Sequence, residues 1–162
     1  MIFLKTIHFS IGSETFVFRT VTPDDVDETY VEALRNQSKY ISSRTNSTTI
    51  NLQKEYIQNI LSSHHNSICG LFIDKRLLGT SGIQQLKRNT NESTTMGLFV
   101  LDSQNRGRGY GKAIIWASTK LSSIEYQISR MEAGMLLENV PSLKAFLACG
   151  FKVISENNGI GR

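Results

Sequence analysis

The stretch LFVLDSQNRGRGYGK, residues 98–112, places the strongest constraint on how this chain folds. An apolar run is followed by three glycines set among two arginines and a lysine, which predicts a buried strand, a short basic loop and a helix beginning near Gly109. Glycines let the main chain turn several N–H groups toward one point. The helix N-terminus adds unpaired donors and the positive end of its dipole. The stretch therefore predicts an anion-binding loop, suited to a phosphate-bearing ligand that lies across the end of the strand.

Two well-known phosphate-binding patterns do not fit this loop. The Walker pattern requires Gly-Lys-Ser/Thr, but Gly111-Lys112 is followed by Ala113, so the hydroxyl that would bind magnesium is missing. The dinucleotide fingerprint requires Gly-x-Gly-x-x-Gly, whereas Gly107, Gly109 and Gly111 recur at every second position. A solvent-exposed turn with hydrated arginines is the alternative for the loop taken alone.

Two motifs resemble those of the GNAT acyltransferase superfamily. Residues 106–111, RGRGYG, are similar to its Arg/Gln-x-x-Gly-x-Gly/Ala signature, which binds the pyrophosphate of acetyl-CoA. The block from Asn139 and Ser142 through Phe146 to Gly150-Phe151 resembles its later motif, Asn-x-x-Ser/Ala-x-x-x-Tyr-x-x-x-Gly-Phe. The motifs occur in the family's order and cover roughly the C-terminal half. The N-terminal half is similar only in its pattern of elements.

Composition indicates one soluble globular domain covering residues 1–162, with 40% hydrophobic and 20% charged residues. No apolar run is long enough to span a membrane, and Lys5 and His8 interrupt the apolar residues of the N-terminus. We expect a cytoplasmic protein whose Cys69 and Cys149 are reduced core residues, with a disulfide as the less favoured alternative. The net charge of +4 is modest, and no aromatic ladder accompanies the basic loop, so we expect neither a nucleic-acid nor a membrane partner.

Apolar periodicity and turn residues predict an α/β fold. In the N-terminal half we expect a helix that starts at Thr22-Pro23-Asp24-Asp25, a polar loop at 36–49 and a second helix capped by Asn51. Gly79 and Gly82 indicate close backbone approach or a bulge. Strands are predicted at 1–9, 15–21, 68–74, 77–86, 92–101, 128–137 and 151–155, and helices at 22–34, 51–61, 109–122 and 141–149.

The resemblance implies a single GNAT-like domain: a mixed six- or seven-stranded sheet, splayed around its fourth strand, with four helices. In the family, the region corresponding to residues 36–49 lies over the acceptor pocket. Little chain follows Phe151, so a seventh strand has little room. Two alternatives follow: the N-terminal segment 1–9 extends the opposite edge of the sheet, or a partner chain covers the place of the seventh strand. The second alternative would make the protein a homodimer. His64-His65 has no companion ligand cluster at a suitable spacing, so no metal is expected.

The resemblance also implies a set of residues that bind acetyl-CoA as co-substrate. Main-chain groups at the end of the strand would bind the pantetheine arm, with the N–H of Leu101 or a neighbour facing the thioester oxygen. The amides of the loop would bind the pyrophosphate, and Arg106 and Arg108 would add charge-assisted contacts. The expected binding residues are Phe99, Val100, Leu101, Arg106, Gly107, Arg108, Gly109, Tyr110, Gly111, Lys112, Asn139 and Ser142.

The catalytic acid and base are harder to assign. Where many relatives place a tyrosine that protonates the leaving thiolate, this chain has Phe146, which has no proton to give. Water can protonate a thiolate, so activity is not excluded, and Phe146→Tyr is expected to be neutral or to raise turnover. Glu92 is the candidate base, with Glu132, Glu138 and a bound water chain as alternatives.

The function that these features favour is N-acetyltransfer from acetyl-CoA directly to a primary amine of a small molecule. Residues 34–36 and 45–56 are similar to the subgroup that acetylates nucleotide-linked amino sugars, and a protein N-terminal amine is the other acceptor considered. A different class stays open: an acyl-CoA-binding regulatory module without turnover, which the absent tyrosine favours.

Overall fold

The computed structural model describes residues 5–37, 48–101, 107–157 and 160–161. These residues form four α-helices and nine strands. The strands are β1 (Thr6–Ile11), β2 (Glu14–Thr20), β3 (Ser67–Ile73), β4 (Arg76–Gln84), β5 (Thr94–Val100), β6 (Met131–Glu132), β7 (Met135–Leu136), β8 (Glu156–Asn157) and β9 (Ile160–Gly161). The helices are α1 (Glu28–Asn36), α2 (Ile50–Leu61), α3 (Tyr110–Glu125) and α4 (Val140–Ala148), with a 3₁₀ turn, η1 (Pro23–Asp25), before α1.

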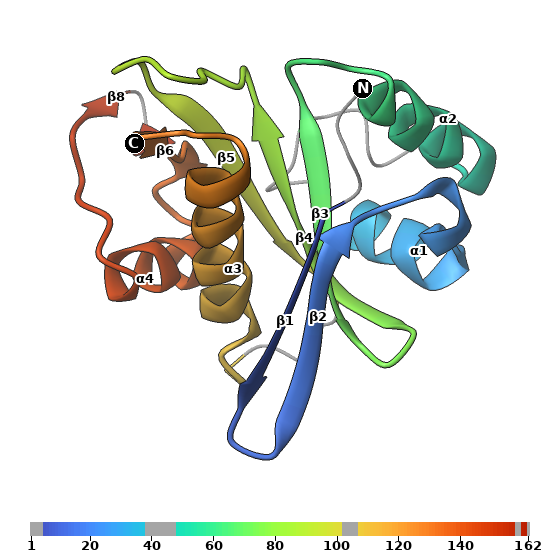
Figure 1. Ribbon diagram of the computed structural model, residues 1–162. Helices are drawn as coiled ribbons and strands as arrows, with labels where there is room; N and C mark the ends of the chain where they lie inside the picture. The colour runs from blue at the N-terminus through green and yellow to red at the C-terminus, as the bar shows by residue number, and fades with distance from the viewer. Residues whose placement is uncertain (1–4, 38–47, 102–106, 158–159, 162) are drawn as a thin grey trace.

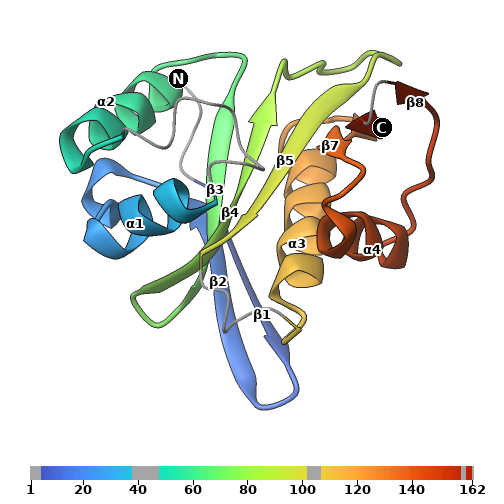
Figure 2. The same ribbon diagram turned by 180° about the vertical axis from the view of Figure 1, so that it is seen from behind.

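The main sheet has six strands in the order β1-β2-β3-β4-β5-β6, all antiparallel except the β5–β6 pair, which is parallel. A small sheet of order β7-β9-β8 continues beside it. Helices α1 and α2 cover one face of the main sheet, and α3 and α4 cover the other (Figures 1 and 2). The predicted mixed α/β sheet with four helices is confirmed.

The sheet separates at β5, one strand later than the fourth strand expected. Within the described residues, β5 pairs with β6 at Thr94–Met131 and Thr95–Glu132, and the two strands then diverge. The remaining length of β5 therefore has a neighbour on its β4 side and an open side toward α4.

Apolar residues fill both layers between the helices and the sheet. Below α3, Ile114, Ala117 and Leu121 pack on Phe18 and Leu71. On the opposite face, the α1 and α2 side chains pack around Phe99 and Leu101 of the β5 end. Both layers meet at β5, so its position is fixed from both sides.

The N-terminal hairpin joins the sheet to α3 through aromatic side chains. Phe9 of β1 stacks on Phe16 of β2 at a ring-centroid distance of 5.5 Å and contacts Trp116 of α3 at 5.1 Å. Phe16 meets the ring of Tyr110, the first residue of α3, edge to face at 5.8 Å. The hairpin thus supports the start of α3.

Two helices begin at other residues than predicted, because other side chains cap them. Thr22 precedes the short turn η1, and α1 begins only at Glu28, where Asp27 caps it by accepting from the Tyr30 N–H at 2.8 Å. Thr49, rather than Asn51, caps α2. Thr and Asn, the predicted caps, are good capping residues, but Asp27 and Thr49 are good capping residues too and occupy the cap positions in the structure.

Gly79 lies where two strands approach too closely for any side chain. A Cβ at this position would lie 2.5 Å from the Phe99 carbonyl oxygen, and the β3–β4 register skips Leu78 beside it. The prediction of close approach next to a bulge is therefore confirmed for Gly79. It is wrong for Gly82, where an added Cβ would meet no atom within 4 Å.

The predicted strand at 128–137 is divided into β6 and β7, and the one at 151–155 is absent. Residues 133 and 134 separate β6 from β7. In the small sheet, the strand hydrogen-bonded to β7 is β9. Residues 151–155 pair with no strand and run as irregular chain. Hydrogen-bond pairing with a neighbour decides whether an apolar segment becomes a strand, and that neighbour is set by tertiary structure.

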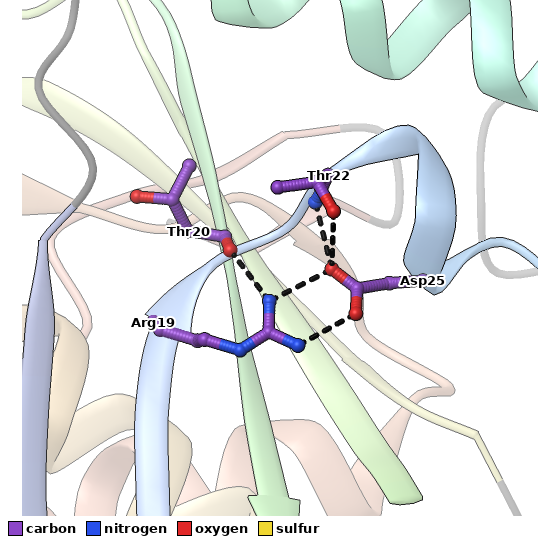
Figure 3. Close-up of polar contacts among 4 residues, drawn as sticks. All are labelled: Arg19, Thr20, Thr22 and Asp25. Carbon is purple, nitrogen blue, oxygen red and sulfur yellow. Dashed lines mark hydrogen bonds and ion pairs between the residues drawn. The ribbon is translucent and has the colours of Figure 1, made fainter. Parts of the chain in front are cut away.

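An ion pair ties η1 to β2 (Figure 3). The Arg19 guanidinium donates two hydrogen bonds to the Asp25 carboxylate, at 2.8 and 2.6 Å, and lies over the Phe72 ring. The Thr22 N–H donates to the same carboxylate at 2.8 Å. Burial raises the pKa of Asp25, but the hydrogen bonds from Arg19 and Thr22 outweigh it and hold that pKa below the usual 3.8.

Asp25→Ala should lower the free energy of unfolding by about 2 kcal/mol, because it leaves a half-buried guanidinium without its partner. The lowered pKa means that this stabilisation is present above pH 3.8 and is lost as the pH falls through the folded-state pKa. Urea unfolding of both proteins from pH 7 to 3 should show the difference shrinking below pH 4. Glu28→Gln, which breaks the more exposed pair with Arg35, is the control and should change stability by less than about 0.5 kcal/mol. A pH-independent difference would contradict the assignment.

No helix in the described part of the chain is long and apolar enough to cross a membrane.

Candidate functional site

A groove of about 670 Å³ opens where β5 and β6 diverge. The end of β5, the glycine loop, the first turn of α3 and the N-terminal part of α4 form its walls. It brings together all of the predicted binding residues except Leu101 and Arg106, of which Arg106 lies outside the described residues. Those that line it are Phe99, Val100, Gly107, Arg108, Gly109, Tyr110, Gly111, Lys112, Asn139 and Ser142.

The glycine loop adopts a conformation that favours glycine at two positions. Gly107 and Gly109 have φ angles of +82° and +85°, and an added Cβ at either would meet no atom within 4 Å. Glycine is therefore required here by backbone conformation and not by lack of space. Gly109 is the N-cap of α3 and makes no side-chain cap, so the N–H groups of the first turn point into the loop without a capping side chain.

The charges on the groove walls favour an anion. Arg108, Lys112 and Lys144 line the groove, and the described residues on its walls include no aspartate or glutamate. The N-terminal end of α3, a helix of 16 residues, adds the positive end of its dipole. Sequence reasoning missed Lys144, although its place inside the second motif, two residues after Ser142, was a usable signal.

The hydrogen-bond ladder decides which main-chain groups of β5 face the groove. The Leu101 N–H donates to Leu78 O at 2.9 Å, so Leu101 and Leu78 are a hydrogen-bonded pair of the antiparallel β4–β5 ladder. Such pairs alternate along a ladder. The N–H and C=O groups of Leu98 and Val100 therefore point away from β4, toward the groove.

This alternation corrects part of the prediction for the strand end. The Leu101 N–H is already bonded to β4, so it cannot face a ligand, and Phe99 shares its orientation. The neighbouring Val100 N–H faces the groove instead, and Leu98, which the sequence reading left out, joins it. Periodicity in the sequence reveals alternating faces, but not which main-chain groups the ladder uses.

Tyr110 contributes main chain to the groove while its side chain points into the core. The ring is 2% exposed and packs on Phe16, and its hydroxyl donates to Glu14 Oε1 at 3.3 Å. A tyrosine inside a glycine-rich motif was predicted to bind the ligand. Here its side chain anchors the start of α3 to the N-terminal hairpin.

The predicted base Glu92 is not at the groove. It lies in the turn before β5, is exposed, and pairs with Lys87 at 2.9 Å. Its alternative Glu132 accepts from Ser93 Oγ at 2.5 Å and pairs with Arg130 at 3.4 Å, on the wall of a different cavity. Glu138 is exposed and does not line the groove.

Phe146 lies on the far side of α4 from the groove. It is 3% exposed, packs with Met96, Ile115 and Ala133, and meets Phe151 edge to face at 5.0 Å. It lines a second cavity of about 490 Å³, between α3, α4 and the segment after α4, and not the groove. The expectation that it occupies the position of a catalytic acid therefore loses its geometric support.

We accordingly expect Phe146→Tyr to leave turnover within about twofold of the wild type, and not to raise it. A hydroxyl added at this ring lies among apolar side chains of the second cavity and should lower stability by about 1 kcal/mol. Thiol release from acetyl-CoA and thermal unfolding measure the two effects. A clear gain in turnover would show that this ring reaches the leaving group.

Neither cysteine is an activated nucleophile. Cys69 and Cys149 are free thiols, as predicted, although Cys149 is only half-buried. Burial raises the pKa of Cys69 to about 11 and also raises that of Cys149. Because the thiolate is the reactive form, both environments disfavour covalent catalysis.

Among the described residues there is no group of three or more His, Cys, Asp or Glu side chains that could hold a metal ion.

The fold and site define an α/β protein whose sheet separates beside a groove lined by basic residues and a glycine loop. The sequence model of the acetyltransferase (GNAT) domain matches residues 15–152, so the chain belongs to the GNAT acetyltransferase family. No curated protein sequence matches the chain at a significant level.

Solved structures share the fold at low identity. The ribosomal-protein-S5-alanine acetyltransferase from Vibrio fischeri is 18% identical, with a TM-score of 0.78 over 93% of this chain and 86% of that one. RimJ from Mycobacterium smegmatis, in complex with CoA-disulfide, is 14% identical, with a TM-score of 0.77 over 96% and 85%. Spermidine N-acetyltransferase from Vibrio cholerae, in complex with CoA and spermine, is 13% identical, with a TM-score of 0.73 over 86% and 82%. At these identities the likeness concerns the fold.

Proposed function

We propose that this protein is an N-acetyltransferase that moves the acetyl group of acetyl-CoA directly to a primary amine. The observation that carries the proposal is the groove, in which a basic glycine loop, the uncapped start of α3 and the open side of β5 meet. These three elements suit the three parts of the donor: its phosphates, its pantetheine arm and its thioester.

The donor would bind along the groove with its pyrophosphate on the loop. The N–H groups of residues 107–112 provide neutral donors, and Arg108, Lys112 and Lys144 provide charge. The pantetheine amides would then pair with the main chain of Leu98 on the side of β5 that faces away from β4, as an added strand does at a sheet edge, and the Val100 N–H would face the thioester. Asn139 and Ser142 approach the same arm from α4.

The transfer step follows from this placement. The neutral amine attacks the thioester carbon, a C–N bond forms, and the C–S bond breaks to release the CoA thiolate. The Val100 N–H stabilises the oxygen that becomes negative during the attack. The amine proton leaves to water, and water protonates the thiolate. Holding both substrates in one groove supplies the acceleration that proximity gives.

The acceptor class is a primary amine of a small molecule or of a protein N-terminus. Two of the structural neighbours named above are a ribosomal-protein-S5-alanine acetyltransferase and a spermidine N-acetyltransferase. Both of these acceptors carry a primary amine. The similarity of residues 34–36 and 45–56 to nucleotide-amino-sugar acetyltransferases adds a third candidate.

An acyl-CoA-binding regulatory module is the second candidate. The observation that favours it is that neither a carboxylate nor a tyrosine hydroxyl is positioned for proton transfer on the described walls of the groove, since Tyr110 is turned into the core. Such a module would bind CoA in the same groove without turnover.

One assay separates the two candidates. Calorimetry with CoA measures binding, and release of free thiol from acetyl-CoA measures turnover in the presence of spermidine, an alanine-initiated peptide and a nucleotide-linked amino sugar. Thiol release that depends on one of these amines supports the enzyme. CoA binding without thiol release above background, across all the amines, supports the module. Absence of CoA binding would refute both.

A further inference from the structure

The end of helix α1 reaches across to the strand that forms the groove. Gln37 is the C-cap of α1, and its side-chain Nε2 donates to Val100 O at 2.9 Å and to Leu101 O at 3.4 Å. Carbonyl oxygens can only accept, so the NH₂ end of the amide must face them. Gln37 also lines the groove, beside Phe99 and Val100. Neither sequence motif includes this residue.

This contact completes the hydrogen bonding of one peptide group. In the peptide that joins Val100 and Leu101, the Leu101 N–H donates to Leu78 O on the β4 side, and Val100 O accepts from Gln37 on the groove side. The β4–β5 ladder cannot pair Val100 O, because that oxygen points away from β4. Gln37 therefore fixes the plane of the last peptide of β5 from the side that the sheet leaves open.

We propose that Gln37 is a positioning residue for the acyl transfer, acting through the Val100 main chain. The inference rests on the proposed function, since it needs the thioester beside Val100. By holding the peptide that follows Val100, Gln37 keeps the Val100 N–H aimed at the thioester oxygen. The bond that it donates to Val100 O also offsets the partial negative charge of that oxygen, which in the proposed complex lies next to an oxygen that becomes negative during transfer.

The same contact couples the two faces of the sheet. Gln37 belongs to α1, on the face opposite α3 and α4, while the groove that it enters is built mainly from β5, α3 and α4. Movement at the end of α1 would therefore change the orientation of the thioester-binding peptide.

Two variants test the role. Gln37→Met keeps the length of the side chain and removes the donor, and Gln37→Glu keeps its shape but presents only acceptors to the two carbonyls. Gln58→Met makes the same change at an exposed position of α2 and is the matched control.

Four measurements separate positioning from binding and from stability: the CoA dissociation constant by calorimetry, the carbonyl ¹³C resonance of bound [1-¹³C]acetyl-CoA without amine, kcat with an amine identified in the thiol-release assay, and the unfolding temperature. In the wild type the carbonyl resonance should move downfield on binding. In Gln37→Met we expect that shift to fall by more than half and kcat to fall about tenfold, with the CoA dissociation constant changed less than twofold. Gln37→Glu should show larger losses, and Gln58→Met none.

The outcomes that overturn the inference are distinct from failure of the proposed function. If Gln37→Met lowers the unfolding temperature but leaves the carbonyl shift intact, the residue is structural and the proposal is wrong. If CoA affinity falls as much as kcat, Gln37 binds the donor instead of positioning the Val100 peptide. A wild-type protein that does not bind CoA would instead refute the proposed function itself.

Discussion

Gly109→Val should abolish CoA binding while the protein stays folded. Gly109 has a φ of +85°, a conformation that costs a β-branched residue well over 1 kcal/mol, and an added Cβ would meet no atom within 4 Å. The strain is relieved if the loop turns to a negative φ, which redirects the N–H groups before α3. Since those N–H groups carry the proposed pyrophosphate contacts, we expect an affinity loss of at least 100-fold by calorimetry.

Gly150→Val is the matched control for this change. Its φ is +89°, it likewise has no atom within 4 Å of an added Cβ, and it lies on the second cavity instead of the groove. It should lower stability to a similar degree and leave CoA affinity within about threefold. Micromolar affinity retained in a folded Gly109→Val protein would count against the loop as the pyrophosphate site.

Val100→Pro should reduce acetyl-CoA turnover by about 100-fold or more. Proline removes the N–H that faces the groove, and the loss of one donor from an oxyanion site has an effect of that size. The β4–β5 ladder should survive, because the Val100 N–H does not belong to it. The CoA dissociation constant should rise by less than about tenfold, since the pyrophosphate contacts are untouched.

Leu101→Pro supplies the contrast, one residue further along. Its N–H donates to Leu78 O, so proline there breaks a ladder bond, leaves that carbonyl unpaired and should cost about 2 kcal/mol of unfolding free energy. Destabilisation by Val100→Pro that equals or exceeds that of Leu101→Pro, measured in urea, would contradict the assignment of the Val100 N–H to the groove.

The parts of the fold that could be predicted from sequence are those set by local chemistry. The glycine-rich stretch predicted a loop that turns the main chain before a helix near Gly109, and α3 begins at Tyr110, after a Gly109 with a positive φ. Apolar periodicity located α2 and α3 to within a few residues, because one face of each must be buried.

The errors concern features that depend on a distant partner. Whether residues 151–155 form a strand depends on which strand lies beside β7, and that place is taken by β9. The groups that β5 turns toward the groove depend on its ladder with β4, which apolar alternation does not specify.

In the candidate site too, features set by local sequence were predicted correctly and features set by distant contacts were not. Both motifs supplied residues to one groove, because each is a local helix start with its own preceding loop. The acid and base assignments relied on family position alone, and the structure places Glu92 in an exposed turn and Phe146 beyond α4. Gln37 could not have been found from spacing, since it meets Val100 only through the fold, 63 positions away in sequence.

The ring contact between Phe9 and Trp116 makes the intrinsic fluorescence of Trp116 sensitive to the position of α3 relative to the N-terminal hairpin. Trp116 is the chain's single tryptophan, is 47% exposed, and sits on the helix whose first turn forms the proposed phosphate site. A ligand that draws that first turn away from the hairpin would alter the surroundings of one indole, without interference from any other. Emission titrations could therefore follow occupancy of the groove in unlabelled protein.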